Sequence, residues 1–226
     1  MDEAVALRAV YERLSARYDI DSWHWRPATP ALDVCLGAIL VQHTTWGNVE
    51  KALANLRAAG AFSIEALLRL PPDELAGLVR PAGLPATKAG RLQSFAGLAV
   101  AAGGLEALLS VSSPELRLRL LATPGVGPET ADVILLYAAA RPAVVHDAYT
   151  ERLCRRLGLG PAPKSYAAWR DWQDVLLPCD VALRQRFHAA VVLHCKETCR
   201  ARPRCAACPL LDLCPAGKGR MAAASI

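Results

Sequence analysis

The sequence predicts an all-α fold. Apolar residues recur at helical spacing along most of the chain, as at Val5, Leu7, Val10 and Leu14, and this spacing places them on one face of a helix. No segment alternates apolar and polar residues between hairpin turns, which is the pattern of a half-buried strand. Gly and Pro interrupt the helical pattern often, so we expect short helices, about ten in number.

Gly and Pro set the expected helix boundaries in chain order. A first helix covers the acidic, amphipathic N-terminus, and each later helix lies between two breaks. Ser113 and Thr123 are examples of residues available as helix caps. The breaks fall at Pro27 and Pro30, Gly60, Pro71 and Pro72, Pro81 to Pro85, Gly103 and Gly104, Pro114, Pro124 to Pro128, Pro142, Gly158 to Pro163, and Pro178.

The composition indicates a globular protein. The chain has 226 residues, of which 53% are hydrophobic and 21% are charged, which is enough for a full core and for one or two domains. The N-terminus lacks the basic start and apolar centre of a signal peptide. The longest apolar stretches, such as 131–140, are too short to span a bilayer. We therefore expect a soluble protein of the cytoplasm, without a membrane segment.

The positive charge is mild, but it is unevenly distributed. The net charge of +5 is consistent with binding to nucleic acid, although it is not sufficient to infer it. Basic residues gather around the C-terminal cysteines, where they form either a solvated tail or, if a metal orders the segment, a cationic surface. These residues are Lys196, Arg200, Arg202, Arg204, Lys218 and Arg220.

Four cysteines lie close together near the C-terminus, at Cys199, Cys205, Cys208 and Cys214. Without a secretory context, thiols this close together indicate one metal centre rather than two disulfides. Only Cys205 and Cys208 form a CxxC pair, whereas structural zinc favours two such pairs. An iron-sulfur cluster fits the irregular spacing equally well. The residues alone therefore support a zinc site and an iron-sulfur cluster equally.

Residues 115–139 are predicted to form a helix, a tight turn and a second helix. Gly125 and Gly127 give the turn its backbone freedom, and Pro128 suits the first turn of the second helix. Such a turn directs unpaired N–H groups outward, where a DNA phosphate could bind. An ordinary corner between two helices is the alternative.

Asp147 follows the second helix of this hairpin and begins another helix, rich in arginine. An Asp at such a position usually caps its helix. Because it comes directly after the hairpin, a catalytic carboxylate is the alternative.

The succession of the hairpin, Asp147 and the four cysteines resembles the endonuclease III superfamily of base-excision DNA glycosylases. The resemblance covers nearly the whole chain and includes residues 40–45 and 83–89 and His194. It implies a monomer that binds double-stranded DNA containing a damaged base. It also implies two helical domains: a six-helix barrel over 22–141, which contains the hairpin, and a second domain of 1–21 plus 142–226.

The resemblance also implies roles for particular residues. The four clustered cysteines would bind a [4Fe-4S] cluster, although five residues separate Cys199 from Cys205 where endonuclease III typically has six. Asp147 would be catalytic. Gln42 and Leu84 would fill the gap left by the extruded base, with a helix cap or core-edge amide and plain core packing as the respective alternatives. The expected DNA contacts are Gln42, His43, Leu84, Lys88, Gly125, Val126, Gly127, Thr130, Arg202 and Arg204.

Glu129 changes the expected mechanism. Family members that also cleave the strand have a Lys at this position, whose amine forms a Schiff base with the sugar. A carboxylate cannot form an imine, so we expect a monofunctional enzyme that hydrolyses the N-glycosidic bond. Glu129 would then orient water or cap its helix. The alternatives are a bifunctional glycosylase and AP lyase with another amine, or a DNA-binding paralogue with weakened catalysis.

A second resemblance concerns the damaged base. Residues 23–27, 42–46 and the segment after Gly127 resemble the 3-methyladenine glycosylase branch of the superfamily. Alkylated purines carry positive charge, so their pockets rely on aromatic stacking and cation–π attraction. Trp25 and Trp46 are the candidates for this stack, with a place in the core as the alternative. Oxidised pyrimidines and mismatched uracil or thymine stay open as substrates.

Overall fold

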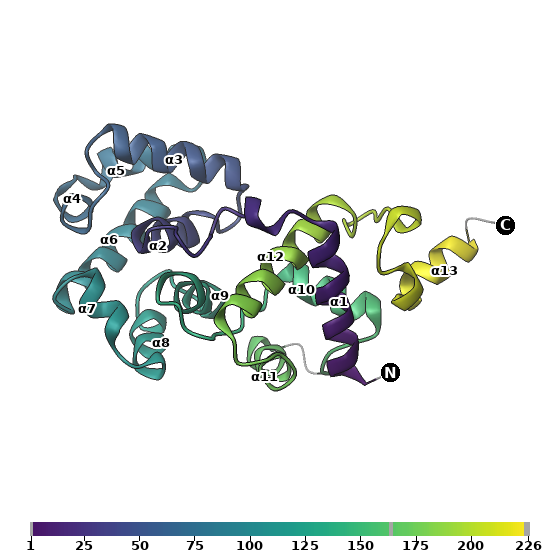
Figure 1. Ribbon diagram of the computed structural model, residues 1–226. Helices are drawn as coiled ribbons and strands as arrows, with labels where there is room; N and C mark the ends of the chain where they lie inside the picture. Colours follow the sequence, from purple (N-terminus) through teal and green to yellow (C-terminus); the bar gives the residue numbers. More distant parts are fainter. Residues whose placement is uncertain (1, 163–164, 224–226) are drawn as a thin grey trace. The chain divides into compact units, whose positions relative to one another are not determined.

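A computed structural model of the protein describes residues 2–162 and 165–223. Within these ranges the chain forms thirteen α-helices and several shorter helical turns, and no strand (Figure 1). The all-α prediction is confirmed. No helix in these ranges is both long and apolar enough to cross a membrane.

The described helices outnumber the ten or so that we expected, in part because the segment after Pro30 splits in two. α2 (Ala31–Leu40) and α3 (Trp46–Ala58) are separated by a turn that contains neither Gly nor Pro. His43 takes a left-handed backbone conformation there, with φ of 56°, and Thr45 is extended before α3. A turn built from ordinary residues gives no breaker signal in the sequence.

The chain divides into two compact units, Trp25–Arg141 and a second unit formed by Met1–His24 with Pro142–Ile226. In the first unit, α2 is almost wholly buried. The core of this first unit contains Val34, Leu36 and Ile39 of α2 together with Leu92 and Phe95 of α6. The helices of the first unit are α2, α3, α4 (Ile64–Arg69), α5 (Pro72–Val79), α6 (Pro85–Ala101), α7 (Leu105–Ser110), α8 (Ser113–Leu121) and α9 (Pro128–Val133). The unit also contains the 3₁₀ turn η2 (Arg80–Ala82) and the π-helical segment η3 (Ile134–Ala138).

In the second unit, α12 packs against α1 and α10. Leu7, Val10 and Leu14 of α1 are buried as expected, but the expectation that Val5 shares their face is wrong, because Val5 is exposed. Residues two positions apart in a helix point to nearly opposite sides, so Val5 lies off the stripe that contains Leu7. The elements of the unit are α1 (Glu3–Arg17), η1 (Ile20–Ser22), α10 (Ala148–Leu157), α11 (Tyr166–Leu176), α12 (Val181–Glu197), η4 (Cys205–Ala207), η5 (Leu211–Leu213) and α13 (Pro215–Ala223).

A buried arginine organises the connection around α10 in this second unit. Arg184 donates to the carbonyl oxygens of Pro178 (2.9 Å), Leu177 (3.0 Å) and Pro142 and pairs with Asp174. One guanidinium therefore fixes both the turn between α11 and α12 and the start of the segment that leads into α10.

Candidate functional site

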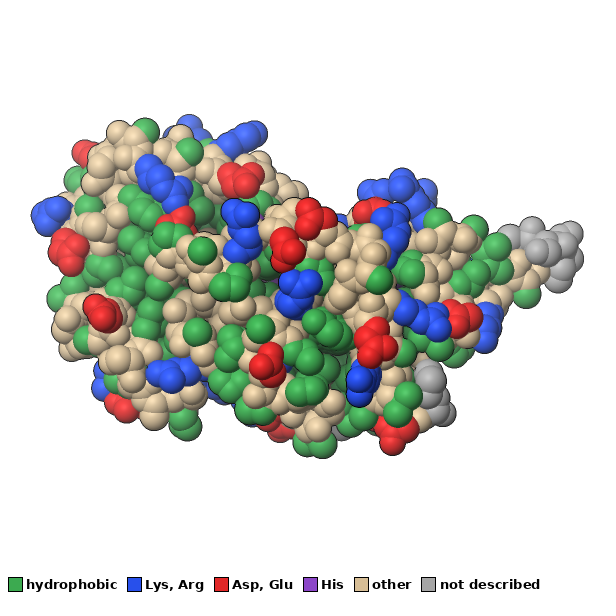
Figure 2. All heavy atoms as spheres, in the orientation of Figure 1, with side chains coloured by type: hydrophobic (Ala, Val, Ile, Leu, Met, Phe, Trp, Pro, Cys, Tyr) green, Lys and Arg blue, Asp and Glu red, His purple; other side chains and the backbone are tan. Residues whose placement is uncertain are grey.

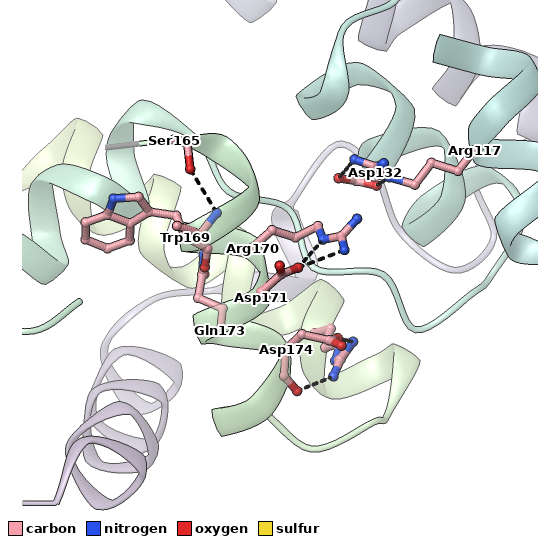
Figure 3. Close-up of polar contacts among 10 residues, drawn as sticks. Arg117, Asp132, Ser165, Trp169, Arg170, Asp171, Gln173 and Asp174 are labelled. Atoms are coloured by element: carbon pink, nitrogen blue, oxygen red, sulfur yellow. Dashed lines mark hydrogen bonds and ion pairs between the residues drawn. The ribbon is translucent and has the colours of Figure 1, made fainter. Parts of the chain in front are cut away.

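The hairpin lies in the first unit, where α8 and α9 are its two helices. Arg117 of α8 and Asp132 of α9 form a two-point ion pair, Nε to Oδ1 at 2.7 Å and Nη2 to Oδ2 at 3.2 Å (Figure 3). Asp132 is buried, so this pair is largely shielded from water. At the turn, Gly125 adopts a φ of 85°, and the N-cap residue of α9 is Gly127, which has no side chain with which to cap the helix.

Two of the predicted DNA-binding residues lie against this turn. Gln42, just after α2, donates through Nε2 to the carbonyl oxygen of Gly125 and to Thr130 Oγ1, both at 3.1 Å. Thr130 and Val126 are buried, so their side chains face the protein. The structure thus brings together residues that lie far apart in the sequence.

Arg91 of α6 completes this arrangement, and sequence reasoning missed it. Its Nη1 donates to Gln42 Oε1. A Cβ added to Gly125 would collide with the Arg91 side chain, so the guanidinium stem lies directly on the turn. A single Arg in a helix gives no signal of such a contact in the sequence.

Leu84 and His43 occupy two exposed turns of the same unit. Leu84 has a φ of 48° and is 55% exposed immediately before α6. A left-handed conformation is unusual for a side chain of this kind, and its exposure argues against the alternative of plain core packing. His43 is likewise exposed.

The prediction that Lys88 contacts DNA is wrong. Its side chain is 1% exposed, and Nζ donates to the carbonyl oxygens of Leu40 (2.8 Å) and Ala82 (2.5 Å). Burial lowers the pKa of Lys88, and the charge of Arg91 lowers it further. Lys88 therefore ties the end of α2 to η2, and it has no access to a phosphate.

Trp25 and Trp46 are in contact, with ring centroids 5.6 Å apart in an edge-to-face arrangement. Tyr137 lies 5.3 Å from the Trp25 ring. A Cβ on Gly37 of α2 would come within 3.1 Å of the Trp46 ring, so the absence of a side chain there makes room for the cluster. Trp25 is buried and Trp46 is only partly so.

Asp147 lies in the second unit as the N-cap of α10. Its Oδ1 accepts hydrogen bonds from the backbone N–H of Thr150 (2.7 Å) and from Thr150 Oγ1 (2.8 Å). His188 of α12 approaches the other oxygen, with Nε2 at 3.6 Å from Oδ2. Burial acts to raise the pKa of Asp147, but His188 and Thr150 outweigh it, so the pKa lies below its ordinary value. A buried carboxylate is thereby kept ionised.

Two further predicted residues are exposed. Glu129 lies in the first turn of α9, where a negative charge is favoured by the helix dipole. Lys196 of α12 places its Nζ 5.6 Å from the centre of the Trp23 ring. Although the residue as a whole is exposed, its amino group is partly buried, and this burial lowers the pKa of Lys196, whereas the charge of Asp147 acts to raise it.

The four clustered cysteines are free thiols that line one pocket. Arg156 Nη1 donates to Cys199 Sγ at 3.2 Å, and the Gly217 N–H donates to Cys214 Sγ at 3.3 Å. The guanidinium donor favours the thiolate form of Cys199, which is the form that binds metal, whereas Cys214 Sγ also donates to the carbonyl oxygen of Arg156 at 3.2 Å. In the described ranges, no three His, Cys, Asp or Glu side chains are grouped closely enough to hold a single ion.

The surroundings of the cysteine loop are apolar on one side and basic on the other. Leu153, Leu157 and Leu210 contribute to the pocket lining, whereas Arg202 and Arg204 are exposed. Elsewhere, on the face that Figure 2 shows, Lys and Arg side chains lie among acidic and hydrophobic ones. Of the other four cysteines, Cys35, Cys154 and Cys195 are buried and Cys179 is exposed.

Comparisons with a family model and with known proteins point to the same family. Residues 36–171 match the family model described as HhH-GPD superfamily base excision DNA repair protein. A Methanocaldococcus jannaschii protein that is named as a DNA repair glycosylase is 39% identical over 84% of this chain and 88% of its own length. Endonuclease III of Treponema pallidum is 31% identical over 94% of this chain and 96% of its own.

Solved structures agree with this result. The H. pylori 3-methyladenine DNA glycosylase bound to 1,N6-ethenoadenine has a TM-score of 0.71 and 27% identity, over 87% of this chain and 98% of its own. An endonuclease III in a non-covalent complex with DNA has a TM-score of 0.81 and 24% identity, over 98% of this chain and 100% of its own. At that identity the second likeness concerns the fold alone.

Proposed function

The chain belongs to the HhH-GPD superfamily of base excision DNA repair proteins and is a DNA glycosylase; from this premise we propose that it hydrolyses the N-glycosidic bond of a damaged nucleotide without cleaving the strand. The observation that supports this proposal most is the state of Asp147. The carboxylate is buried, fixed at one oxygen by Thr150 and kept ionised in part by His188.

Asp147 acts on the sugar. As the bond between C1′ and the base breaks, the electron pair of that bond leaves with the base. The ionised Asp147 carboxylate stabilises the oxocarbenium character that develops at the sugar. Water then adds to C1′, and its proton passes to the Asp147 carboxylate and from there to solvent. The products are the free base and an abasic site.

Glu129 supports hydrolysis without strand cleavage. Strand cleavage in this superfamily needs an amine that forms an imine with C1′, and the hairpin of this chain offers a carboxylate at that position. Lys88 is not a substitute because its ammonium is bound to two carbonyl oxygens. A lyase that uses Lys196 is the second candidate, because burial lowers the pKa of this amine.

The aromatic cluster favours an alkylated purine as the damaged base. Trp46, which is only partly buried, offers its indole ring to a cationic base, which is attracted to the face of an aromatic ring. The buried Trp25 packs edge-to-face against Trp46 and supports it. Such a base needs little acid catalysis because it leaves as a neutral molecule. The related H. pylori glycosylase binds a modified adenine, which agrees with a purine.

DNA is bound by the hairpin and by the cysteine loop. The N–H groups of the turn at Gly125, Val126 and Gly127 are suited to a phosphate, and Gln42 and Leu84 lie at turns from which they can enter the gap in the duplex. His43, Arg202 and Arg204 are exposed and contribute further contacts. Thr130 acts indirectly, because its hydroxyl holds Gln42.

Cys199, Cys205, Cys208 and Cys214 would hold a [4Fe-4S] cluster. They fit this group in kind, because all four are free thiols that line one pocket, and four Cys thiolates are the usual ligands of such a cluster. When bound, the cluster would supply fixed shape to the loop that presents Arg202 and Arg204.

A panel of duplexes with one lesion each tests this function. Each duplex contains an alkylated purine, an oxidised pyrimidine, or a mismatched uracil or thymine, and the free base is measured by chromatography. We expect release of the alkylated purine by the wild type and not by Asp147→Asn. Base release that is equal in the two proteins would contradict the proposal.

A further inference from the structure

The side chain of Gln42 is held at both ends of its amide. Nε2 donates to Gly125 O and Thr130 Oγ1, and Oε1 accepts from Arg91. A carbonyl oxygen can only accept and a guanidinium can only donate, so these partners allow one orientation of the amide. The side chain that is proposed to fill the gap in DNA is therefore fixed before DNA binds.

Arg91 is placed for this contact by the hairpin itself. Its stem occupies the space beside Gly125 where a Cβ would lie. Any other residue at this position would displace Arg91, and it would also be strained at a φ of 85°. Gly125 thus provides the turn and at the same time makes room for the arginine.

Lys88 and Arg91 are three positions apart on α6, which places them as neighbours on one side of the helix. Lys88 fixes backbone, through the carbonyl oxygens of Leu40 and Ala82. Arg91 fixes a side chain, that of Gln42. The two cations of α6 therefore hold neighbouring parts of the chain: Lys88 holds the end of α2, and Arg91 holds Gln42 in the turn after it.

We infer that Arg91 is a positioning residue that acts through Gln42, holding its amide on the hairpin in the orientation that enters the DNA gap. This inference rests on the proposed role of Gln42. Fixing a long side chain at an interface costs binding free energy, and a side chain that is already fixed avoids that cost. Loss of Arg91 should therefore weaken binding only where there is a gap to fill.

Binding to two duplexes tests this inference. The duplexes are identical except that one contains a tetrahydrofuran abasic-site analogue, and each dissociation constant is measured at several salt concentrations. We expect Arg91→Met to weaken binding to the abasic duplex by about threefold to tenfold. Binding to the undamaged duplex and the salt dependence of binding should not change. In a Gln42→Ala background, Arg91→Met should have no further effect.

The matched control is Arg69→Met, which removes the same charge from an exposed position on α4 of the same unit. It should leave the preference for the abasic duplex unchanged. If Arg91→Met does not fold, Arg91→Gln keeps a polar side chain over Gly125 without the charge, and the same loss of preference is expected.

Two results would overturn the inference on Arg91 alone. One is equal weakening for both duplexes with a smaller salt slope, which indicates a direct phosphate contact. The other is simple addition of the Arg91→Met and Gln42→Ala effects. If Gln42→Ala itself leaves the preference unchanged, the proposed role of Gln42 fails, and the inference on Arg91 fails with it.

Discussion

At the scale of single residues, Asp147 combines two tasks that can be separated. Its Oδ1 caps α10, and its charge is proposed to stabilise the sugar cation. Asn caps a helix as well as Asp does, so Asp147→Asn should fold normally. We expect the single-turnover rate of base release to fall by about a hundredfold to ten-thousandfold, the usual contribution of such a group.

The matched control for this substitution is Asp180→Asn. Asp180 caps α12 in the same way, accepting from the backbone N–H of Leu183 at 2.6 Å. This variant should retain the wild-type rate. Equal losses in the two variants would show that helix capping, and not the carboxylate at position 147, sets the rate.

The pH dependence tests how Asp147 is kept ionised. Because its pKa lies below the ordinary value, the carboxylate stabilises the fold above about pH 3.9 and loses this contribution as the pH falls through the folded-state pKa. In His188→Gln, a group that lowers this pKa is absent. The acidic limb of the single-turnover rate should therefore move to higher pH than in the wild type. An unchanged limb would mean that His188 does not act on Asp147.

Some of these residue contacts could have been predicted from the sequence, and others could not. Asp132 stands just before the apolar run Val133 to Ala140, and a lone carboxylate in such a place signals a buried partner. Lys88 gave no such signal, because a Lys in a helix is usually exposed. His188 meets Asp147 only through the packing of α12 against α10, which a single sequence does not specify.

At the scale of elements, the hairpin depends on the ion pair between its helices. Arg117→Met would leave Asp132 buried without this ion-pair partner, and breaking a buried pair in this way costs about 3 kcal/mol or more. Because the Arg117 side chain is 25% exposed, we expect a value near the lower end, measured as a lower free energy of unfolding in urea.

Arg119→Met is the control for the hairpin prediction. Arg119 also lies on α8, but its pair with Glu115 is exposed, so its loss should cost about 0.5 kcal/mol or less. Similar costs for Arg117→Met and Arg119→Met would contradict the role given to the buried pair.

The elements themselves followed largely from Gly and Pro. The turn at Pro124 to Pro128 separates α8 from α9, and Gly103 and Gly104 lie between α6 and α7, as expected. The sequence did not show that the second hairpin helix changes to the π-helical segment η3 after Val133. In a continuous apolar run of this length, the spacing of apolar residues does not distinguish the hydrogen bonding of an α-helix from that of a π-helix.

At the scale of the whole molecule, the cysteine loop is the part whose chemistry the sequence defines least. Because it contains one CxxC pair, the residues alone favour neither zinc nor an iron-sulfur cluster. We expect the purified protein to be brown and to contain iron, and Cys208→Ser to lose both colour and iron. Cys179→Ser, an exposed thiol outside the loop, should retain them. A colourless wild-type protein with stoichiometric zinc would contradict this assignment.

The most direct test of the central claim compares base release with strand cleavage in one reaction. The accepted lesion duplex is incubated with wild-type protein, and aliquots are analysed with alkali, without alkali, and after borohydride treatment. We predict broken strands only after alkali and no covalent adduct, because Glu129 replaces the amine. Strand breaks without alkali, together with a borohydride adduct that disappears in Lys196→Met, would show instead that the enzyme is a lyase.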